Sequence, residues 1–170
     1  MSKTTRWIHR AFALVAFVVS LMTYSLTVQP TVPFWDCGEF SAATAWQQVP
    51  HPPGAPFFLA VARLMHLVLP INGQPTWDTG IRINFVSVLA SAFTIWLLYL
   101  TIVKVIEHFR GRRIESTGDA LAVCGAALVG ALALNFSDTF WFNGVESEVY
   151  AMSSLLVQII VYAMMRWNEE

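Results

Sequence analysis

Four long apolar stretches decide what this chain can fold into. They cover residues 11–28, 81–103, 120–136 and 149–165. A helix needs about 20 apolar residues to cross ~30 Å of hydrocarbon, and about 17 mark the lower end of the range. Each stretch is therefore predicted to be a transmembrane helix. Only 12% of the residues are charged, about half the share of an ordinary soluble domain, so the sequence predicts an all-α membrane protein.

The first apolar stretch has a second interpretation. Lys3, Arg6 and Arg10 precede it, and a basic start before an apolar core is also typical of a cleaved signal peptide. The core is long for a signal peptide, however, and residues 25–30 offer no small-x-small cleavage site. We therefore expect a transmembrane helix whose basic start lies in the cytoplasm.

Residues 54–69 form a fifth apolar stretch, which we expect not to cross the membrane. It is 16 residues long and contains Arg63 and His66, and both properties favour a helix that lies in the membrane interface. If it crossed, the basic residues at 104–113 would face outside, against the tendency of Lys and Arg to stay in the cytoplasm. We therefore predict an outer loop over residues 29–80 that contains this interfacial helix.

This topology separates the charges. The cytoplasmic side receives eight of the ten basic residues, namely Lys3, Arg6, Arg10, Lys104, Arg110, Arg112, Arg113 and Arg166. The outer side receives six acids, namely Asp36, Glu39, Asp78, Asp138, Glu146 and Glu148. Because acids contribute little to orientation, their collection on one side needs another cause, and chemistry is a candidate.

The chain is predicted to be a single membrane module over residues 1–170. Its hydrophobic content continues almost to the last residue without a closing domain, so we expect it to be part of a longer protein. The net charge of −1 and the lack of a basic, aromatic-studded stripe argue against nucleic-acid binding. Cys37 and Cys124 lie far apart and lack metal-ligand spacing, so we expect neither a disulfide nor a cysteine metal site.

Asp36 and Glu39 are the first candidates for chemistry. Three residues apart on a helix, they share one face, and the pKa values of neighbouring carboxyls separate, which leaves one group ionised as a possible general base. The same spacing is that of a helix-capping box. Both interpretations stay open from the spacing alone.

The turn His51-Pro-Pro-Gly54 is the second candidate. It precedes a helix, and a helix N-terminus presents free amide groups that bind phosphate, so His51 could donate to an anionic headgroup. A purely structural role for His51 is the alternative. Arg82 could pair with a phosphate or with Asp78.

Glu146 and Glu148 stand at the outer start of the fourth stretch, next to Tyr150. The aromatic residues at 140–142 are typical of an interfacial belt. Ionisable groups at the edge of a membrane helix are costly unless they are solvated or paired, which makes them functional candidates. Glu148, followed by an apolar run, is the stronger candidate, because Glu146 could face water.

Three motifs carry a family resemblance. They are Trp35-Asp-Cys-Gly-Glu-Phe40, His51-Pro-Pro-Gly-Ala-Pro56 and Trp141-Phe-Asn-Gly-Val-Glu-Ser-Glu-Val-Tyr150. In this order they resemble a bacterial family of polytopic membrane proteins of unknown function that is related to a vertebrate protein O-mannosyltransferase of the endoplasmic reticulum. The first two motifs also resemble, more distantly, the GT-C superfamily of glycosyltransferases.

The resemblance implies an N-terminal GT-C-like module of a glycosyltransferase. Such an enzyme moves a sugar from a polyprenyl-phosphate carrier to a protein or glycan acceptor on the outer face of the membrane, here the bacterial inner membrane with a periplasmic loop. It implies that Asp36 is the base on the acceptor hydroxyl and that Glu39 assists. The expected substrate-binding residues are His51, Arg82, Glu146, Glu148 and Tyr150.

No residue is assigned as a metal ligand, and a metal requirement stays open. Paired acids could hold Mg²⁺ or Mn²⁺, whereas relatives that use a monophosphate carrier often work without a metal. The alternative function is a small non-catalytic membrane subunit that binds lipid or a partner protein. A transporter is a more distant alternative, because no acid lies at mid-membrane depth.

Overall fold

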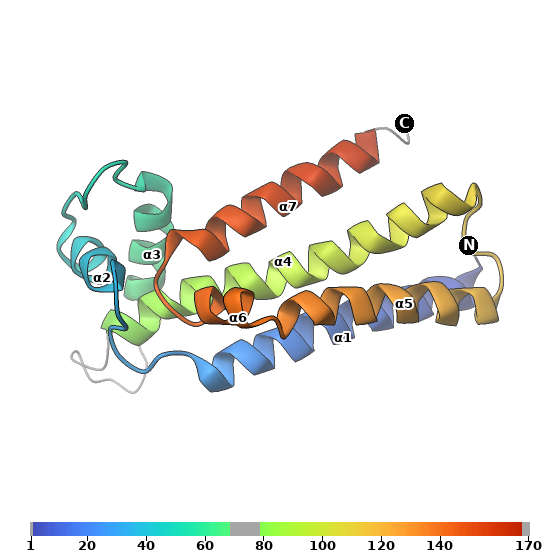
Figure 1. The fold of residues 1–170 in the computed structure, drawn as a ribbon, viewed down its shortest axis with the longest axis horizontal. Helices are drawn as coiled ribbons and strands as arrows, with labels where there is room; N and C mark the ends of the chain where they lie inside the picture. The colour runs from blue at the N-terminus through green and yellow to red at the C-terminus, as the bar shows by residue number, and fades with distance from the viewer. Residues whose placement is uncertain (1, 69–78, 168–170) are drawn as a thin grey trace.

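The computed structural model describes residues 2–68 and 79–167, and within them the chain is entirely helical (Figure 1). The helices are α1 (Lys3–Thr27), α2 (Cys37–Trp46), α3 (Pro56–Val68), α4 (Thr79–Arg110), α5 (Thr117–Asn135), α6 (Asp138–Gly144) and α7 (Val149–Trp167). Four of them, α1, α4, α5 and α7, are long and apolar enough to cross a membrane. The predicted all-α membrane fold is confirmed.

The long helices extend beyond the apolar stretches predicted from the sequence. α1 begins at Lys3 rather than at residue 11, and the Ser2 side chain caps it by accepting the Thr5 N–H at 3.2 Å. α4 continues past residue 103 to Arg110. In both cases the helix continues through the basic residues that flank its apolar stretch. Hydropathy alone does not detect these helical ends.

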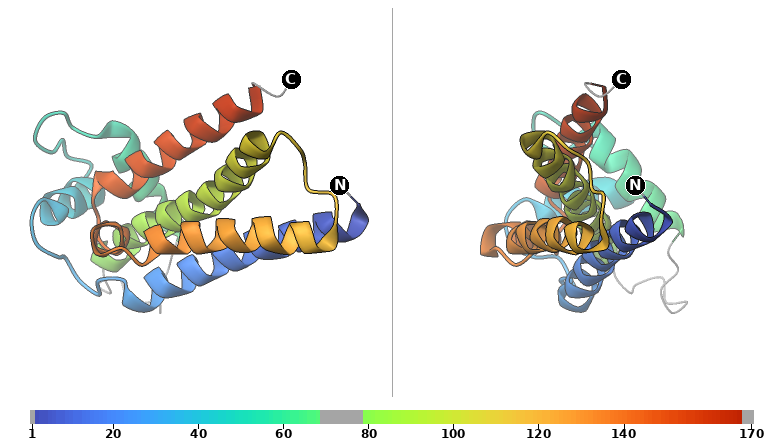
Figure 2. Two further views of the ribbon diagram at one scale, coloured as in Figure 1. Left: turned by 45° about the vertical axis from the view of Figure 1, so that its right-hand side comes forward. Right: turned by 90° about the vertical axis from the view of Figure 1, so that its right-hand side faces the viewer.

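α4 is the centre of the bundle. It packs against α1, α3, α5 and α7. In its apolar 18-residue segment 67% of the residues are buried, compared with 11% to 28% in the corresponding segments of the other three long helices. α1 and α5 run together on one side of α4, and α7 runs along the other side (Figure 2). The outer faces of α1, α5 and α7 therefore stay available to lipid or to further protein.

Small residues bring α5 close to α1 and α4. Its buried positions include Ala120, Cys124, Ala127 and Ala131, which share one side of the helix. A Cβ added at Gly130 would lie only 3.1 Å from the Cδ1 atom of Ile102. Small residues at helix interfaces allow this kind of close approach in membranes.

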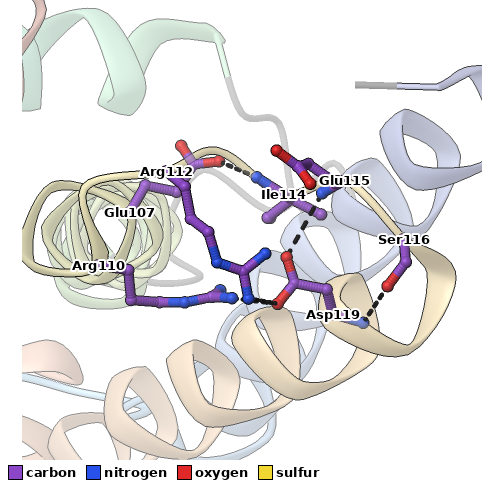
Figure 3. Close-up of polar contacts among 7 residues, drawn as sticks. All are labelled: Glu107, Arg110, Arg112, Ile114, Glu115, Ser116 and Asp119. Carbon is purple, nitrogen blue, oxygen red and sulfur yellow. Dashed lines mark hydrogen bonds and ion pairs between the residues drawn. The ribbon is translucent and has the colours of Figure 1, made fainter.

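A polar network fixes the turn between α4 and α5 (Figure 3). The Arg110 guanidinium pairs with the Asp119 carboxylate. The Glu107 carboxylate accepts the backbone N–H of Ile114 at 2.9 Å, and Ser116 caps α5 by accepting the Asp119 N–H at 3.1 Å. This turn lies at the same end of the bundle as the N-terminus, which we call the basic end.

The opposite end of the bundle holds α2, α3, α6 and the start of α7 (Figure 1). We call it the acid end. α1 ends there and α4 begins there. α3 lies at this end and does not run the length of the bundle. Its 13 residues span ~20 Å, less than the ~30 Å of a hydrocarbon core. Residue 69 and Asp78, which the sequence analysis used, lie outside the described residues.

The start of α4 holds the segment that leads into α2. Asn84 is fully buried, and its side-chain NH₂ donates to the carbonyls of Gln29 (2.9 Å) and Thr31 (3.0 Å). A Cβ added at Gly80 would lie 3.0 Å from the Thr31 carbonyl carbon, so glycine permits this contact. The segment is thus fixed against α4 just before Asp36.

Candidate functional site

Asp36 stands at the N-cap position of α2. Its carbonyl accepts the Phe40 N–H at 2.9 Å, but its side chain makes no capping hydrogen bond. The Glu39 side chain bonds to His51 instead of returning to the helix start. The capping-box interpretation is therefore wrong for these side chains. The Asp36 side chain is 58% exposed, so a ligand can reach it.

Glu39 and His51 form a two-point contact. The His51 N–H donates to Oε1 of Glu39, and Nδ1 of His51 lies beside Oε2, each at 2.6 Å. These hydrogen bonds lower the pKa of Glu39 and raise the pKa of His51. Nε2 of the same imidazole lies 3.9 Å from Oδ2 of Asp36. One histidine thus joins both carboxylates of the first motif.

These three side chains could also hold a metal ion. Asp36, Glu39 and His51 each offer one ligand atom, and the three atoms lie within 4.8 Å of one another. Two carboxylate oxygens and an imidazole nitrogen suit Mn²⁺ better than Mg²⁺, which prefers oxygen ligands. A bound cation would replace the Glu39–His51 hydrogen bond, so the ion pair and the metal site are competing states of the same residues.

Residues 145–148, which we call the acid loop, connect α6 to α7 and contain both glutamates. The Gln29 N–H donates to the Val145 carbonyl at 3.0 Å. The Ser87 hydroxyl, from α4, donates to the Glu148 carbonyl at 3.4 Å. The acid loop is therefore held by the same segment and the same helix that position Asp36.

Cys37 links the acid loop to the start of α2. The Ser147 hydroxyl donates to the Cys37 carbonyl at 3.3 Å, and the Cys37 thiol donates to Oε1 of Glu148 at 3.5 Å. Burial, with the charges of Glu146 and Glu148, raises the pKa of Cys37 to about 12. Cys37 is therefore a protonated donor that orients Glu148, and not a nucleophile.

Both glutamates of the acid loop are buried, with 2% of Glu146 and 6% of Glu148 exposed. The burial of Glu146 excludes the alternative that this side chain faces water. Burial, followed by the charge of Glu148, raises the pKa of Glu146 to about 7. Burial also raises the pKa of Glu148, and the nearby charge of Asp36 adds to this effect. Oε2 of Glu146 has no hydrogen-bond partner among the described residues.

Comparison with known proteins identifies the family. Residues 36–170 match the family described as the protein O-mannosyl-transferase TMEM260 N-terminal domain. The chain belongs to this family. The match covers the first motif from Asp36 onward, both other motifs and helices α2 to α7. The predicted relation to protein O-mannosyltransferases is confirmed.

Two curated relatives carry the TMEM260 name. Protein O-mannosyl-transferase tmem260 of Dictyostelium discoideum is 26% identical over 153 residues, which cover 89% of this chain and 16% of the relative. Protein O-mannosyl-transferase TMEM260 of Mus musculus is 25% identical over 158 residues, covering 93% and 19%. The chain thus spans less than a fifth of the length of these relatives. No solved structure matches it.

The structure brings together five of the seven residues proposed from the sequence. They are Asp36, Glu39, His51, Glu146 and Glu148. Arg82 donates from Nη1 to the His66 carbonyl at 3.3 Å, between α3 and α4. Tyr150 is 61% exposed and lines a separate cavity of about 240 Å³ with Asn143 and Ser91.

Sequence reasoning missed the residues that position the site. Cys37 lies inside the first motif and Ser147 between the two glutamates, so motif membership was the available signal. Ser87 and Asn84 lie three residues apart on α4. Polar residues recurring at this spacing in a membrane helix predict one buried polar face, which these two share.

Proposed function

We propose that this domain supplies catalytic residues of a membrane glycosyltransferase of the protein O-mannosyltransferase type. The full-length enzyme would transfer a sugar from a polyprenyl-phosphate carrier to a hydroxyl of a protein acceptor. The observation that supports this most is the meeting of Asp36, Glu39 and His51 with the two buried glutamates at one end of a membrane bundle. The names of the two relatives support the reaction class.

The acid end suits this reaction because it lies where apolar helices end. A lipid-linked donor holds its phosphate at the membrane surface, and the acceptor arrives from water. In our proposal the basic end faces the cytoplasm and the acid end faces outward, which in a bacterial cell is the periplasm. α3 would lie in the interface below the site.

The transfer needs a base and a stabilised leaving group. The Asp36 carboxylate takes the proton of the acceptor hydroxyl, and the acceptor oxygen forms a bond to the anomeric carbon of the sugar. The bond between that carbon and the phosphate oxygen breaks, and the electron pair leaves with the carrier phosphate. Configuration at the anomeric carbon inverts. A positioned base contributes typically 10²–10⁴-fold to such a rate.

His51 has two tasks in this proposal. Its hydrogen bonds with Glu39 orient the ring, and the raised pKa keeps the imidazole protonated to higher pH. Nε2–H then faces Asp36 and the space where a phosphate would arrive, so it can stabilise the leaving group. Arg82 remains a second candidate for the phosphate, from the α3–α4 side.

Glu146 and Glu148 form the inner wall of the site. Glu148 lies close enough for the charges of Asp36 and His51 to act on it, and a protonated Glu146 could donate a hydrogen bond to a sugar hydroxyl. If a divalent cation binds, Asp36, Glu39 and His51 would hold it, and it would supply positive charge for the phosphate.

The test is glycan transfer by the full-length protein in cells. Wild type and Asp36→Asn are expressed at matched levels, and mass spectrometry compares the hexose-modified peptides of exported proteins. Loss of a defined set of modified peptides in the variant supports the catalytic function. An unchanged set in cells that lack the gene altogether would favour the non-catalytic subunit.

A further inference from the structure

A groove opens between α1 and α4, from Arg10 toward the basic end to Phe17 and Phe93 near the middle of the two helices. It encloses about 390 Å³. The residues that matter to its chemistry are Arg10, Leu14 and Phe17 of α1 and Phe93, Trp96 and Leu100 of α4. Its walls are apolar except at the Arg10 end.

The floor of the groove is a connected aromatic surface. The Phe17 and Phe93 rings lie 5.0 Å apart, and the Phe93 and Trp96 rings meet edge to face at 6.3 Å. Leu14 is 60% exposed and Phe93 is 42% exposed at its rim. Apolar side chains this exposed, on helices that cross a membrane, offer a surface to a hydrocarbon chain.

The mouth of the groove is basic. Arg10 is exposed, and its guanidinium carbon lies 5.9 Å from the ring centroid of Trp7. Arg6, about one helical turn before Arg10, is also exposed. Seven residues separate Arg10 from Phe17, which corresponds to ~10 Å along the helix. If Arg10 and Trp7 lie at the depth of the lipid headgroups, the apolar floor at Phe17 lies ~10 Å deeper, at the depth of the acyl chains.

Two further charged groups lie near this mouth. The charges of Glu107 and Lys104 both act on His9. The Glu107 carboxylate accepts the Ile114 N–H in the α4–α5 turn, and the Lys104 ammonium lies 6.0 Å from the Tyr162 ring centroid. The His9 ring faces inward, with Nδ1 3.1 Å from the Tyr99 hydroxyl. Arg10 is the cationic side chain that lines the groove.

We propose that the groove binds an anionic phospholipid, with the phosphate at Arg10 and an acyl chain along Phe17, Phe93 and Trp96. Charge complementarity selects the headgroup, and the aromatic floor receives the chain. The groove shares no lining residue with the acid site. The proposed lipid site is therefore distinct from the site of the proposed transfer reaction.

The first experiment identifies the occupant in the full-length protein. A photo-crosslinking amino acid replaces Leu14, and a control replaces Val157 on α7, which is 59% exposed. We expect phospholipid adducts at residue 14 in which acidic headgroups are enriched over their share of the membrane. The adducts at residue 157 should have the same headgroup composition as the membrane. Crosslinks from residue 14 to a peptide of the same chain or of a second copy would overturn the proposal.

The second experiment tests the headgroup contact. The full-length protein is reconstituted with phosphatidylcholine and phosphatidylglycerol, and co-purified lipid is quantified for Arg10→Gln and for Arg113→Gln, an exposed arginine in the α4–α5 turn. Arg10→Gln should lower the enrichment of phosphatidylglycerol roughly fivefold, the factor for ~1 kcal/mol per basic residue at an anionic surface. Equal effects of the two substitutions would contradict a specific site.

Discussion

His51 contacts Glu39 twice, through its backbone N–H and through Nδ1, each 2.6 Å from a different carboxylate oxygen. The two residues lie twelve positions apart in the chain. The contact therefore determines where the imidazole stands relative to Asp36, and it joins the first two sequence motifs into one site.

This contact predicts a pH dependence of sugar transfer. The pKa of Glu39 is lowered, so its contribution to the folded site is lost as pH falls through that lowered value. The pKa of His51 is raised, so its contribution is complete below pH ~6.5 and is lost as pH rises through the raised value. Transfer by the full-length enzyme should therefore decline on the alkaline side as His51 loses its proton.

Glu39→Gln should move this alkaline decline to lower pH, because the largest cause of the raised His51 pKa is removed. The measurement is the initial transfer rate between pH 6 and 9 for both proteins. Asp138→Asn, which changes an exposed acid on α6, is the matched control. An identical pH profile in Glu39→Gln would show that His51 does not take part as described.

Glu146 predicts a stability that depends on pH. Its pKa is raised from an ordinary 4.5 to about 7, so the folded state favours the protonated form. That stabilisation is complete below about pH 4.5 and is lost as pH rises through 7. Glu146→Gln should therefore be more stable than wild type at pH 8 by roughly 2 to 3 kcal/mol.

Thermal unfolding of the purified protein at pH 6 and pH 8 measures this effect. Wild type should lose stability over this interval, whereas Glu146→Gln should lose less. If the substitution lowers stability equally at both pH values, the Glu146 carboxylate has a partner that the described residues do not include.

Cys37 should resist alkylation. It is fully buried, and with a pKa of about 12 its thiol carries almost no thiolate at pH 8, and the thiolate is the reactive form. A Cys124→Ala protein treated with maleimide at pH 8 should stay unlabelled until it is unfolded in detergent. Rapid labelling of the folded protein would show that Cys37 does not donate to Glu148.

Asn84→Ala should destabilise the acid end. The substitution leaves the Gln29 and Thr31 carbonyls without their donor, and each unsatisfied buried group costs about 1 to 3 kcal/mol. Asn143→Ala is the matched control, because the Asn143 side chain donates within its own helix, to the Thr139 carbonyl. A midpoint of thermal unfolding lowered equally by both substitutions would argue against a specific role for Asn84.

Hydropathy and charge were sufficient to predict the membrane helices, because the cost of crossing a bilayer depends on length and composition. They did not predict α6, since the run Phe140–Phe142 was interpreted as an interfacial belt. They also left open that Glu146 faces water, because its burial depends on contacts of the acid loop with Gln29 and Ser87. Tertiary contacts between distant segments leave no periodic signal in a sequence.

Motif spacing predicted which residues carry chemistry better than it predicted their contacts. Asp36 and Glu39 are three residues apart in either a capping box or a chemical pair, so spacing could not choose. The choice depended on His51, which a turn containing two prolines brings back onto Glu39. Arg82 and Tyr150 were grouped with the site by motif and position, and the structure gives them other neighbours.

The most direct test of the catalytic proposal is the initial rate of mannose transfer from a synthetic polyprenyl-phosphate mannose to an acceptor peptide by the purified full-length enzyme. Asp36→Asn should lower this rate at least ~100-fold, as expected for loss of a general base, whereas Asp138→Asn should leave it unchanged. A rate for Asp36→Asn within a few fold of wild type, with normal folding, would contradict the role of Asp36 as the base.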